Sequence, residues 1–87
     1  MYQIRYRLIF FSWLELLVNK QEQLFLLGER IKSKRLILGI TQTELANRIG
    51  KDHPSINRLE KGKINPSYFF LLEVCLGLEI DIKELFD

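Results

Sequence analysis

The sequence is poor in the residues that build disulfide frameworks and metal sites. Its 87 residues include one cysteine, Cys75, and one histidine, His53. A lone cysteine excludes an intrachain disulfide and is typical of a reducing cytoplasm. These two residues are also too few for a zinc site. Because His53 has no nucleophile or carboxylate partner at catalytic spacing, and no glycine-rich phosphate loop is present, we expect neither an enzyme nor a bound cofactor.

A long hydrophobic run is missing as well. The most apolar stretch, FFSWLELLV at residues 10–18, is shorter than the roughly 20 residues that a membrane helix needs. No small-residue cleavage site follows it, as a signal peptide would require. We therefore expect a cytoplasmic protein with no membrane partner. With 47% hydrophobic residues, the chain can bury one compact core.

Charge is distributed unevenly along the chain, although the net charge is only +2. Residues 30–63 carry nine basic and three acidic side chains, residues 1–29 carry three of each, and residues 64–87 carry one basic and five acidic. A basic stretch is more often an ordinary solvated surface than a binding site. In this chain it coincides with the motif described below, as expected of a surface that approaches phosphates.

Hydrophobic periodicity and capping residues predict an all-α protein with five helices between residues 24 and 87. Thr41 and Glu44 have the spacing of a capping box, Gly50 suits a helix end, and Asp52 suits the start of the next helix. Ser67 and Asp81 are expected to cap the last two helices. The predicted helices cover residues 24–38, 42–49, 53–61, 68–78 and 81–86.

Residues 1–23 are predicted to form an extra apolar N-terminal segment, separate from the domain at residues 24–87. Two interpretations stay open. The segment is either an additional element that packs on the domain or pairs two subunits, or the product of an over-extended reading frame whose translation begins near Val18. Dimerisation is the sharper hypothesis, because exposed aromatic and leucine side chains need cover.

Residues 41–61 have the pattern of a helix-turn-helix. Leu45, Ala46 and Ile49 fall on one face of the first helix, and Ile56 and Leu59 fall on one face of the second. The small side chain of Ala46 allows the two helices to cross closely at the turn.

Three runs extend this pattern and resemble the Cro/repressor (XRE) family: RIKSKRLILGITQTELANRIG, SINRLEKGKINPS and DIKELF. The resemblance covers residues 27–86. It implies a lambda-repressor-like DNA-binding domain that acts as a small transcriptional regulator, specifically a repressor, on a double-stranded operator. Alternatives within the family are an antitoxin, with a toxin as partner, or a restriction-modification controller. A protein-interaction module that has lost DNA binding is a further alternative.

The family's roles can be carried over residue by residue. Its third helix lies in the major groove, which implies base contacts by His53, Pro54, Asn57 and Arg58. Phosphate contacts are implied for Gln42, Ser55, Lys61 and Lys63. An ion pair between Arg35 and Glu60 is expected to join the first and third helices. Arg30, Lys34 and Lys51 are weaker phosphate candidates.

The resemblance also implies a homodimer, and it has one clear departure. Phe70, Leu85 and Phe86 compete with the N-terminal apolar run as the dimer contact. Glu79 stands where the family usually has a helix-ending glycine, so the backbone there must either become left-handed or bend in another way. Cys75 is expected to be a buried structural thiol.

Overall fold

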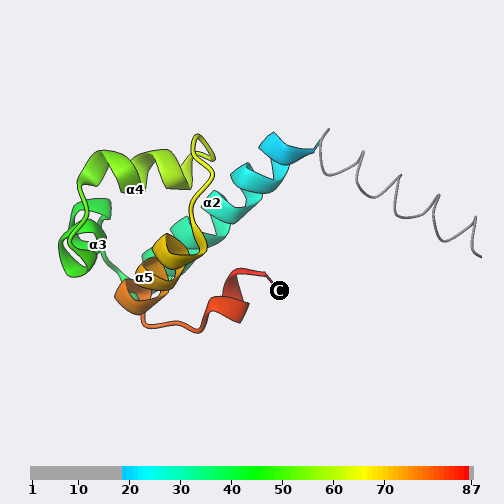
Figure 1. Ribbon diagram of the computed structural model, residues 1–87. Coiled ribbons are helices and arrows are strands. Elements are labelled where there is room, and N and C mark those ends of the chain that lie inside the picture. The colour runs from blue at the N-terminus through cyan, green and yellow to red at the C-terminus, as the bar shows by residue number, and fades with distance from the viewer. Residues whose placement is uncertain (1–18, 87) are drawn as a thin grey trace, which may run out of the picture.

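The computed structural model describes residues 19–86, which form helices and no strand. In chain order these are α2 (Lys20–Leu38), α3 (Gln42–Ile49), α4 (His53–Glu60), α5 (Tyr68–Leu78) and the 3₁₀ helix η1 (Ile82–Leu85), with the labels of Figure 1. The all-α prediction is confirmed. None of these helices is long and apolar enough to cross a membrane.

The expected fifth α-helix is a single 3₁₀ turn. Its bonds join residues three apart, from Glu84 N–H to the Asp81 carbonyl at 3.0 Å and from Phe86 N–H to the Lys83 carbonyl at 3.1 Å. Four residues are enough for such a turn but too few for a regular α-helix. The prediction of an α-helix here was therefore wrong, although Asp81 does cap the turn.

The first described helix begins earlier than expected, at Lys20 rather than Leu24. The side chains of residues 20–23 are polar and exposed, so they add nothing to the apolar periodicity from which the start was predicted. Residues 1–18 lie outside the described residues. Both interpretations of the N-terminal segment therefore stay predictions.

The capping residues are placed as the sequence predicted. The Thr41 hydroxyl accepts from Glu44 N–H at 3.0 Å, and Glu44 Oε1 accepts from Thr41 N–H at 3.1 Å, which completes the capping box. Asp52 accepts from Ser55 N–H at 2.8 Å to start α4. Gly39 and Gly50 end α2 and α3 in the left-handed conformation.

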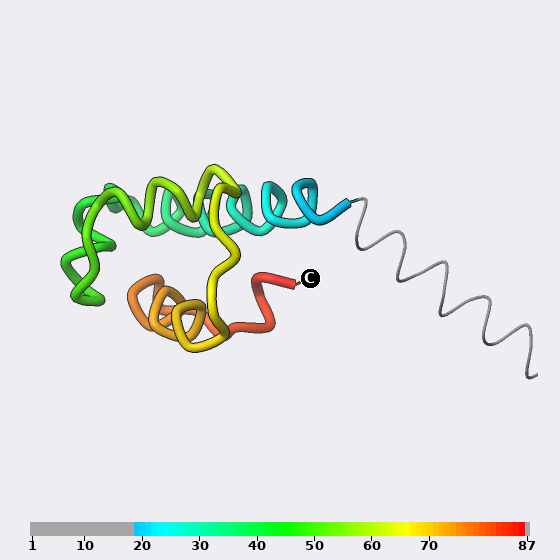
Figure 2. Tube along the Cα trace, turned by 45° about the horizontal axis from the view of Figure 1, so that its top comes forward, coloured from blue at the N-terminus to red at the C-terminus, as the bar shows by residue number. Residues whose placement is uncertain are grey.

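The core lies where the helices converge, and α3 and α4 both pack on it. Figure 2 shows α4 running beside α2 at the top of the molecule, with α5 and η1 below. The predicted inward positions of the motif are buried, except that Ile49 is only partly so. The largest fully buried side chains are Ile31, Leu45, Ile56, Leu59, Leu78, Leu85 and Val74.

Two glycines let α2 and the end of α4 touch backbone to backbone. A Cβ atom at Gly28 would lie 2.7 Å from the carbonyl oxygen of Leu59, and one at Gly62 would lie 2.7 Å from the backbone nitrogen of Phe25. Neither contact leaves room for a side chain. Sequence reasoning assigned no role to Gly28, because a glycine inside a helix carries no signal of what packs against it.

Glu79 takes up the left-handed backbone, with φ of 60°, and is the only non-glycine residue among those described with positive φ. Arg48 stabilises this helix end by donating to the Gly77 carbonyl at 2.9 Å and to Glu79 Oε2 at 3.2 Å. Cys75 is buried beside it on α5, and burial raises the pKa of its thiol, so the thiol stays protonated and is part of the core.

Candidate nucleic-acid interface

The side of α4 that faces away from the core carries the predicted base-contacting residues. His53, Pro54 and Arg58 are exposed, and Ser55 and Asn57 are half-buried. Pro54 lies in the first turn, where its missing N–H costs no helix hydrogen bond. Hydrogen bonding to Ser55, through its side chain and then its backbone N–H, lowers the pKa of Asp52, so the capping carboxylate is ionised at neutral pH.

A buried ion pair joins α4 to α2. Arg35 Nε donates to Glu60 Oε2 at 2.7 Å, and Arg35 Nη2 donates to Glu60 Oε1 at 3.0 Å. The two side chains are only 8% and 2% exposed. Arg35 Nη1 also donates to the Ile40 carbonyl at 2.8 Å. Hydrogen bonding to Glu60 raises the pKa of Arg35, so the guanidinium stays charged.

Gln42 links this ion pair to the exposed residues of α4. Its Nε2 donates to Glu60 Oε1 at 3.0 Å. Its Oε1 lies 2.8 Å from His53 Nε2 and accepts from Asn57 Nδ2 at 3.1 Å. Three residues expected to contact DNA separately are thus hydrogen-bonded to one another. No sequence pattern indicated these bonds, because they join helices through side chains far apart in the chain.

Folding divides the nine basic residues of 30–63 into five with partners, among them Arg35 and Arg48 described above, and four without a partner among the described residues. Arg30 donates to the Leu85 carbonyl at 3.0 Å, Lys34 pairs with Glu84 at 3.4 Å, and Lys51 pairs with Glu73 at 3.6 Å. Their charges therefore face η1 and α5, which weakens all three as phosphate candidates. Four others have neither an ion pair nor a side-chain hydrogen bond with a described residue: Lys32, Arg58, Lys61 and Lys63.

Lys32 is a functional candidate that sequence reasoning missed. It lines a groove of about 270 Å³ between α2 and α4, together with Lys61 and Gln42. The remaining lining residues are Phe25, Glu29, Asn57 and Glu60. Nothing in the sequence distinguishes Lys32 from Lys34, which is paired with Glu84. Only the packing of α4 against α2 shows that Lys32 lines the groove.

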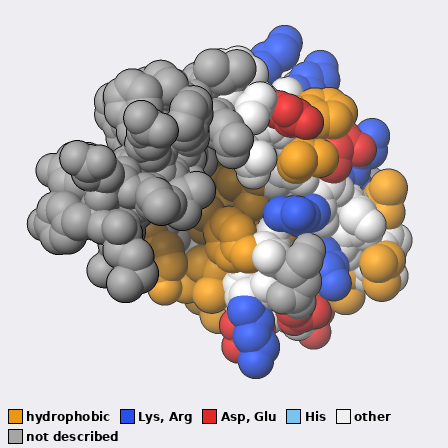
Figure 3. All heavy atoms as spheres, turned by 90° about the vertical axis from the view of Figure 1, so that its right-hand side faces the viewer, with side chains coloured by type: hydrophobic (Ala, Val, Ile, Leu, Met, Phe, Trp, Pro, Cys, Tyr) orange, Lys and Arg blue, Asp and Glu red, His pale blue; other side chains and the backbone are white. Residues whose placement is uncertain are grey.

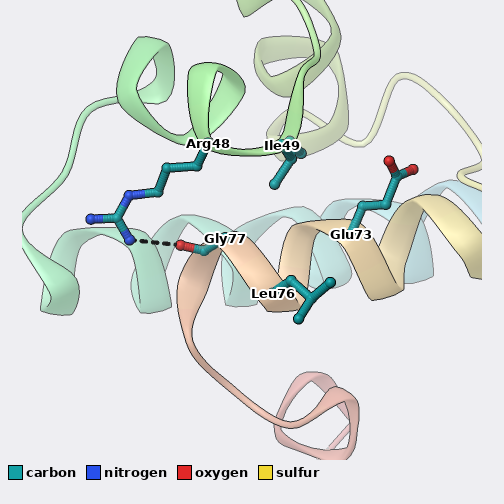
Figure 4. A pocket seen from close by; sticks show the side chains of 5 residues that line it. All are labelled: Arg48, Ile49, Glu73, Leu76 and Gly77. Atoms are coloured by element: carbon teal, nitrogen blue, oxygen red, sulfur yellow. Dashed lines mark hydrogen bonds between the residues drawn. The ribbon is translucent and has the colours of Figure 1, made fainter.

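A second cavity, of about 280 Å³, lies between α3 and α5 and is lined by Arg48, Ile49, Glu73, Leu76 and Gly77. Figure 4 shows the Arg48 guanidinium extending to the Gly77 carbonyl, while Leu76 and Glu73 come from α5. Arg48 Nη1 is used in closing the end of α5, and Glu73 is paired with Lys51 at 3.6 Å. In the described part of the chain, no three His, Cys, Asp or Glu side chains converge to hold a metal ion.

The apolar residues considered for dimerisation differ in exposure. Leu85 is fully buried and Phe70 is partly buried against the core, so Leu85 is excluded as a contact between subunits. Phe86 is 59% exposed. On the face drawn in Figure 3, hydrophobic side chains gather beside scattered basic and acidic ones, so this face is not a continuous basic surface.

Comparison with known proteins agrees with this geometry. The helix-turn-helix family model matches residues 31–85. Two uncharacterized HTH-type transcriptional regulators of Archaeoglobus fulgidus are each 39% identical over 57 residues, covering 66% of this chain and 81% and 80% of theirs.

Two solved structures share the fold. The restriction-modification controller protein C.AhdI from Aeromonas hydrophila superposes with a TM-score of 0.73 at 29% identity, over 75% of this chain and 94% of that one. The clp gene regulator ClgR from C. glutamicum superposes with a TM-score of 0.71 at 26% identity, over 74% of this chain and 83% of that one.

Proposed function

Because the chain belongs to the helix-turn-helix family, we propose that it binds a specific sequence in double-stranded DNA and acts as a small transcriptional regulator. In this proposal α4 lies in the major groove, with its N-terminal turns against the base edges. The protein works in the cytoplasm and needs no cofactor. Its activity is binding and not catalysis.

The observation that carries the proposal is the division of the basic side chains. Arg30, Lys34 and Lys51 make contacts with η1 or α5, whereas Arg58, Lys61 and Lys63 make none with a described residue. The free positive charge of residues 30–63 therefore lies on α4, on the residues after it and on Lys32, which lines the groove beside α4. A surface that binds phosphates needs charge of this kind, since each phosphate contact releases a counterion.

Exposure supports the roles that we propose for individual residues. Arg58 is exposed and can donate two hydrogen bonds to O6 and N7 of guanine. Asn57 and His53 are proposed to reach base edges, and Pro54 offers only apolar contact, for example to a thymine methyl group. Lys61 and Lys63 are proposed to bind phosphates, together with Ser55 and the remaining N–H of Gln42.

The buried pair of Arg35 and Glu60 is proposed to set the angle at which α4 is held. Both helices that the pair joins contribute to the groove beside α4. Because both oxygens of Glu60 are hydrogen-bonded to Arg35, rotation of α4 about its own axis would break the pair.

We propose a homodimer that represses transcription. One recognition helix covers too few base pairs for useful specificity in a genome, and a two-fold dimer doubles the site. The superposition with a restriction-modification controller favours that role as the second candidate. Nothing in the described residues supports a toxin partner in particular. A module that has lost DNA binding is disfavoured, because the outward side of α4 keeps Arg58, Lys61 and polar readers.

Selection of bound duplexes from a random DNA pool tests the function directly. The expected result is a palindromic sequence whose half-sites lie one helical turn apart, about 10 base pairs. The same selection gives the base preferences and the symmetry. Binding that is equally strong to all duplexes, or no binding to duplex DNA, would contradict the proposal.

A further inference from the structure

We propose that Gln42 is a positioning residue that orients Asn57 to read adenine, and that the buried carboxylate of Glu60 dictates this orientation. The inference rests on the proposed function, because it concerns one base contact made by α4. It goes further by naming the base and by assigning its selection to two residues that do not touch it.

The first step is the orientation of the Gln42 amide. Glu60 is paired with Arg35 through both oxygens, so its carboxylate is ionised and can only accept hydrogen bonds. The Gln42 atom that lies 3.0 Å from Glu60 Oε1 must therefore be the amide nitrogen. The opposite orientation would place two acceptors together without a proton, inside a partly buried site. Glu60 thus holds the Gln42 oxygen on the side of His53 and Asn57.

The orientation of Gln42 in turn fixes the orientation of the Asn57 amide. The Gln42 oxygen can only accept, so the Asn57 atom 3.1 Å away must be Nδ2, and the His53 nitrogen 2.8 Å away must carry a hydrogen. Asn57 Nδ2 keeps one hydrogen for another partner. Asn57 Oδ1 accepts from no other described side chain. Since no buried side-chain polar atom of residues 19–86 lacks a partner, this oxygen is open to solvent.

The third step compares what Asn57 offers with what the bases present. One N–H and one carbonyl oxygen, side by side, complement the N7 acceptor and the N6 amino donor of adenine. Guanine presents two acceptors and thymine one, so either can take one hydrogen bond from the free N–H of Asn57 but leaves the Asn57 oxygen without a donor. Cytosine offers only its amino group, and thus one hydrogen bond. The network therefore selects adenine.

His53 belongs to the same hydrogen-bond network, but the network does not fix which role its second ring nitrogen takes, donor or acceptor. Its Nε2 donates to Gln42, which leaves Nδ1 as an acceptor in the neutral ring and as a donor in the protonated ring. Asn57 does not titrate, so its orientation depends only on Gln42. Asn57 is consequently the residue at which the effect of Gln42 can be measured.

The test uses the full chain and the duplex selected by the wild-type protein. We expect one adenine that the wild type requires and that Asn57→Ala no longer prefers. Replacing this adenine with purine, which keeps N7 and lacks the amino group, should weaken wild-type binding about tenfold. The same replacement should leave the affinity of Asn57→Ala unchanged, because that variant has already lost the contact.

Gln42→Met tests the positioning role, since it keeps the length of the side chain and removes the amide. We expect the preference for adenine at this position to fall about tenfold, with preferences at other positions unaltered. Glu60→Gln is a second variant that frees the Gln42 amide to turn over, in case Gln42→Met does not fold. Thr43→Ala, an exposed neighbour on α3, is the control and should keep the full preference.

Three results would overturn the inference. The first is a preference for guanine, cytosine or thymine at the position that Asn57→Ala relaxes, and the second is a selection profile that Asn57→Ala leaves unchanged. The third is an unchanged adenine preference in the folded variants Gln42→Met and Glu60→Gln. In each of them the wild type still selects a duplex sequence. A wild type that selects no sequence would instead contradict the proposed function itself.

Discussion

At the scale of single residues, the outward side of α4 is specialised through its hydrogen-bond partners. Asn57 and His53 are tied to Gln42, whereas Arg58 has no side-chain partner among the described residues. These two neighbouring residues, both proposed to contact bases, therefore differ in side-chain freedom. The Asn57 side chain is already fixed by Gln42 in the absence of DNA. The Arg58 side chain is not fixed, so it would lose more conformational entropy on binding a base.

Arg58→Ala should remove the preference at a single base pair and cost about 1–3 kcal/mol of binding free energy on the selected site. The reason is the loss of up to two hydrogen bonds to one base edge. Fluorescence anisotropy with the selected duplex and with random duplexes measures it. If the variant discriminates between them as well as the wild type does, Arg58 is not a reader.

Glu60→Ala should lower the free energy of unfolding by about 3–5 kcal/mol, because it leaves the Arg35 guanidinium buried without its partner. Denaturant unfolding followed by circular dichroism measures this change. Lys34→Ala is the matched control, since it breaks a pair whose side chains are about one-third exposed, and it should cost at most about 1 kcal/mol. Equal effects of the two changes would show that the buried pair has no special role.

At the scale of elements, the position of α4 depends on contacts at both of its ends. Asp52 caps its start, and its last turn rests on the backbone of α2 at Gly28. The helix has only eight residues, so it would be marginal alone and depends on these contacts. The strained left-handed backbone at Glu79, by contrast, lies at the far end of α5, where Arg48 of α3 bonds to it.

Gly28→Ala should destabilise the protein by about 1–3 kcal/mol, because the new methyl group would overlap the carbonyl groups of Leu59 and Glu60. The sign is informative, since replacing a glycine with alanine inside a helix ordinarily stabilises it by about 0.5–1 kcal/mol. Ser33→Ala, on an exposed position of the same helix, controls for helix propensity. A rise in melting temperature for Gly28→Ala would show that α2 and α4 are not packed backbone to backbone.

The cap of α4 should give the stability a measurable pH dependence. The pKa of Asp52 is lower in the folded chain than in the unfolded one, so its contribution is complete above the unfolded pKa of about 4 and is lost as the pH falls through the folded pKa. Asp52→Asn keeps an acceptor that does not titrate. The melting-temperature advantage of the wild type over Asp52→Asn should therefore be constant above about pH 5 and shrink below about pH 4. An advantage that is the same at all pH values would exclude this role.

At the scale of the whole molecule, packing brings acidic residues of the C-terminal part of the chain against some of the basic residues and not others. Acidic residues of α5 and η1 pair with Lys51 and Lys34, which cancels part of the basic excess away from α4. The net charge of +2 therefore understates the positive charge that DNA would meet. Salt dependence of binding is the property that reports this distribution.

Lys61→Ala should reduce the slope of log K against log salt by about 0.9, and it should weaken binding to all sequences alike, because a phosphate contact carries no base information. Titrations at several salt concentrations measure the slope. Lys34→Ala, whose charge is paired with Glu84, should leave the slope unchanged. A shift in base preference by Lys61→Ala would assign Lys61 to a base instead of a phosphate.

The sequence by itself determined the features that depend on neighbours along the chain. Capping bonds of Thr41 and Asp52 join residues three apart, and the buried positions of α3 and α4 repeat with the helical period, so both can be read without knowing the fold. The positions of Arg35 and Glu60 followed from the family resemblance, which carries tertiary information in its spacing.

Only the tertiary structure decided which polar side chains meet. The bonds of Gln42 to Glu60 and Asn57, the pairing of Lys34 with Glu84, and the fit of Gly28 against α4 all join residues at least 15 positions apart. Such contacts leave no periodic trace, because a polar residue on a helix surface has the same local pattern whether it faces solvent, DNA or another helix. For this reason the sequence indicated the surface that we propose to read DNA, while packing decided which atoms that surface presents.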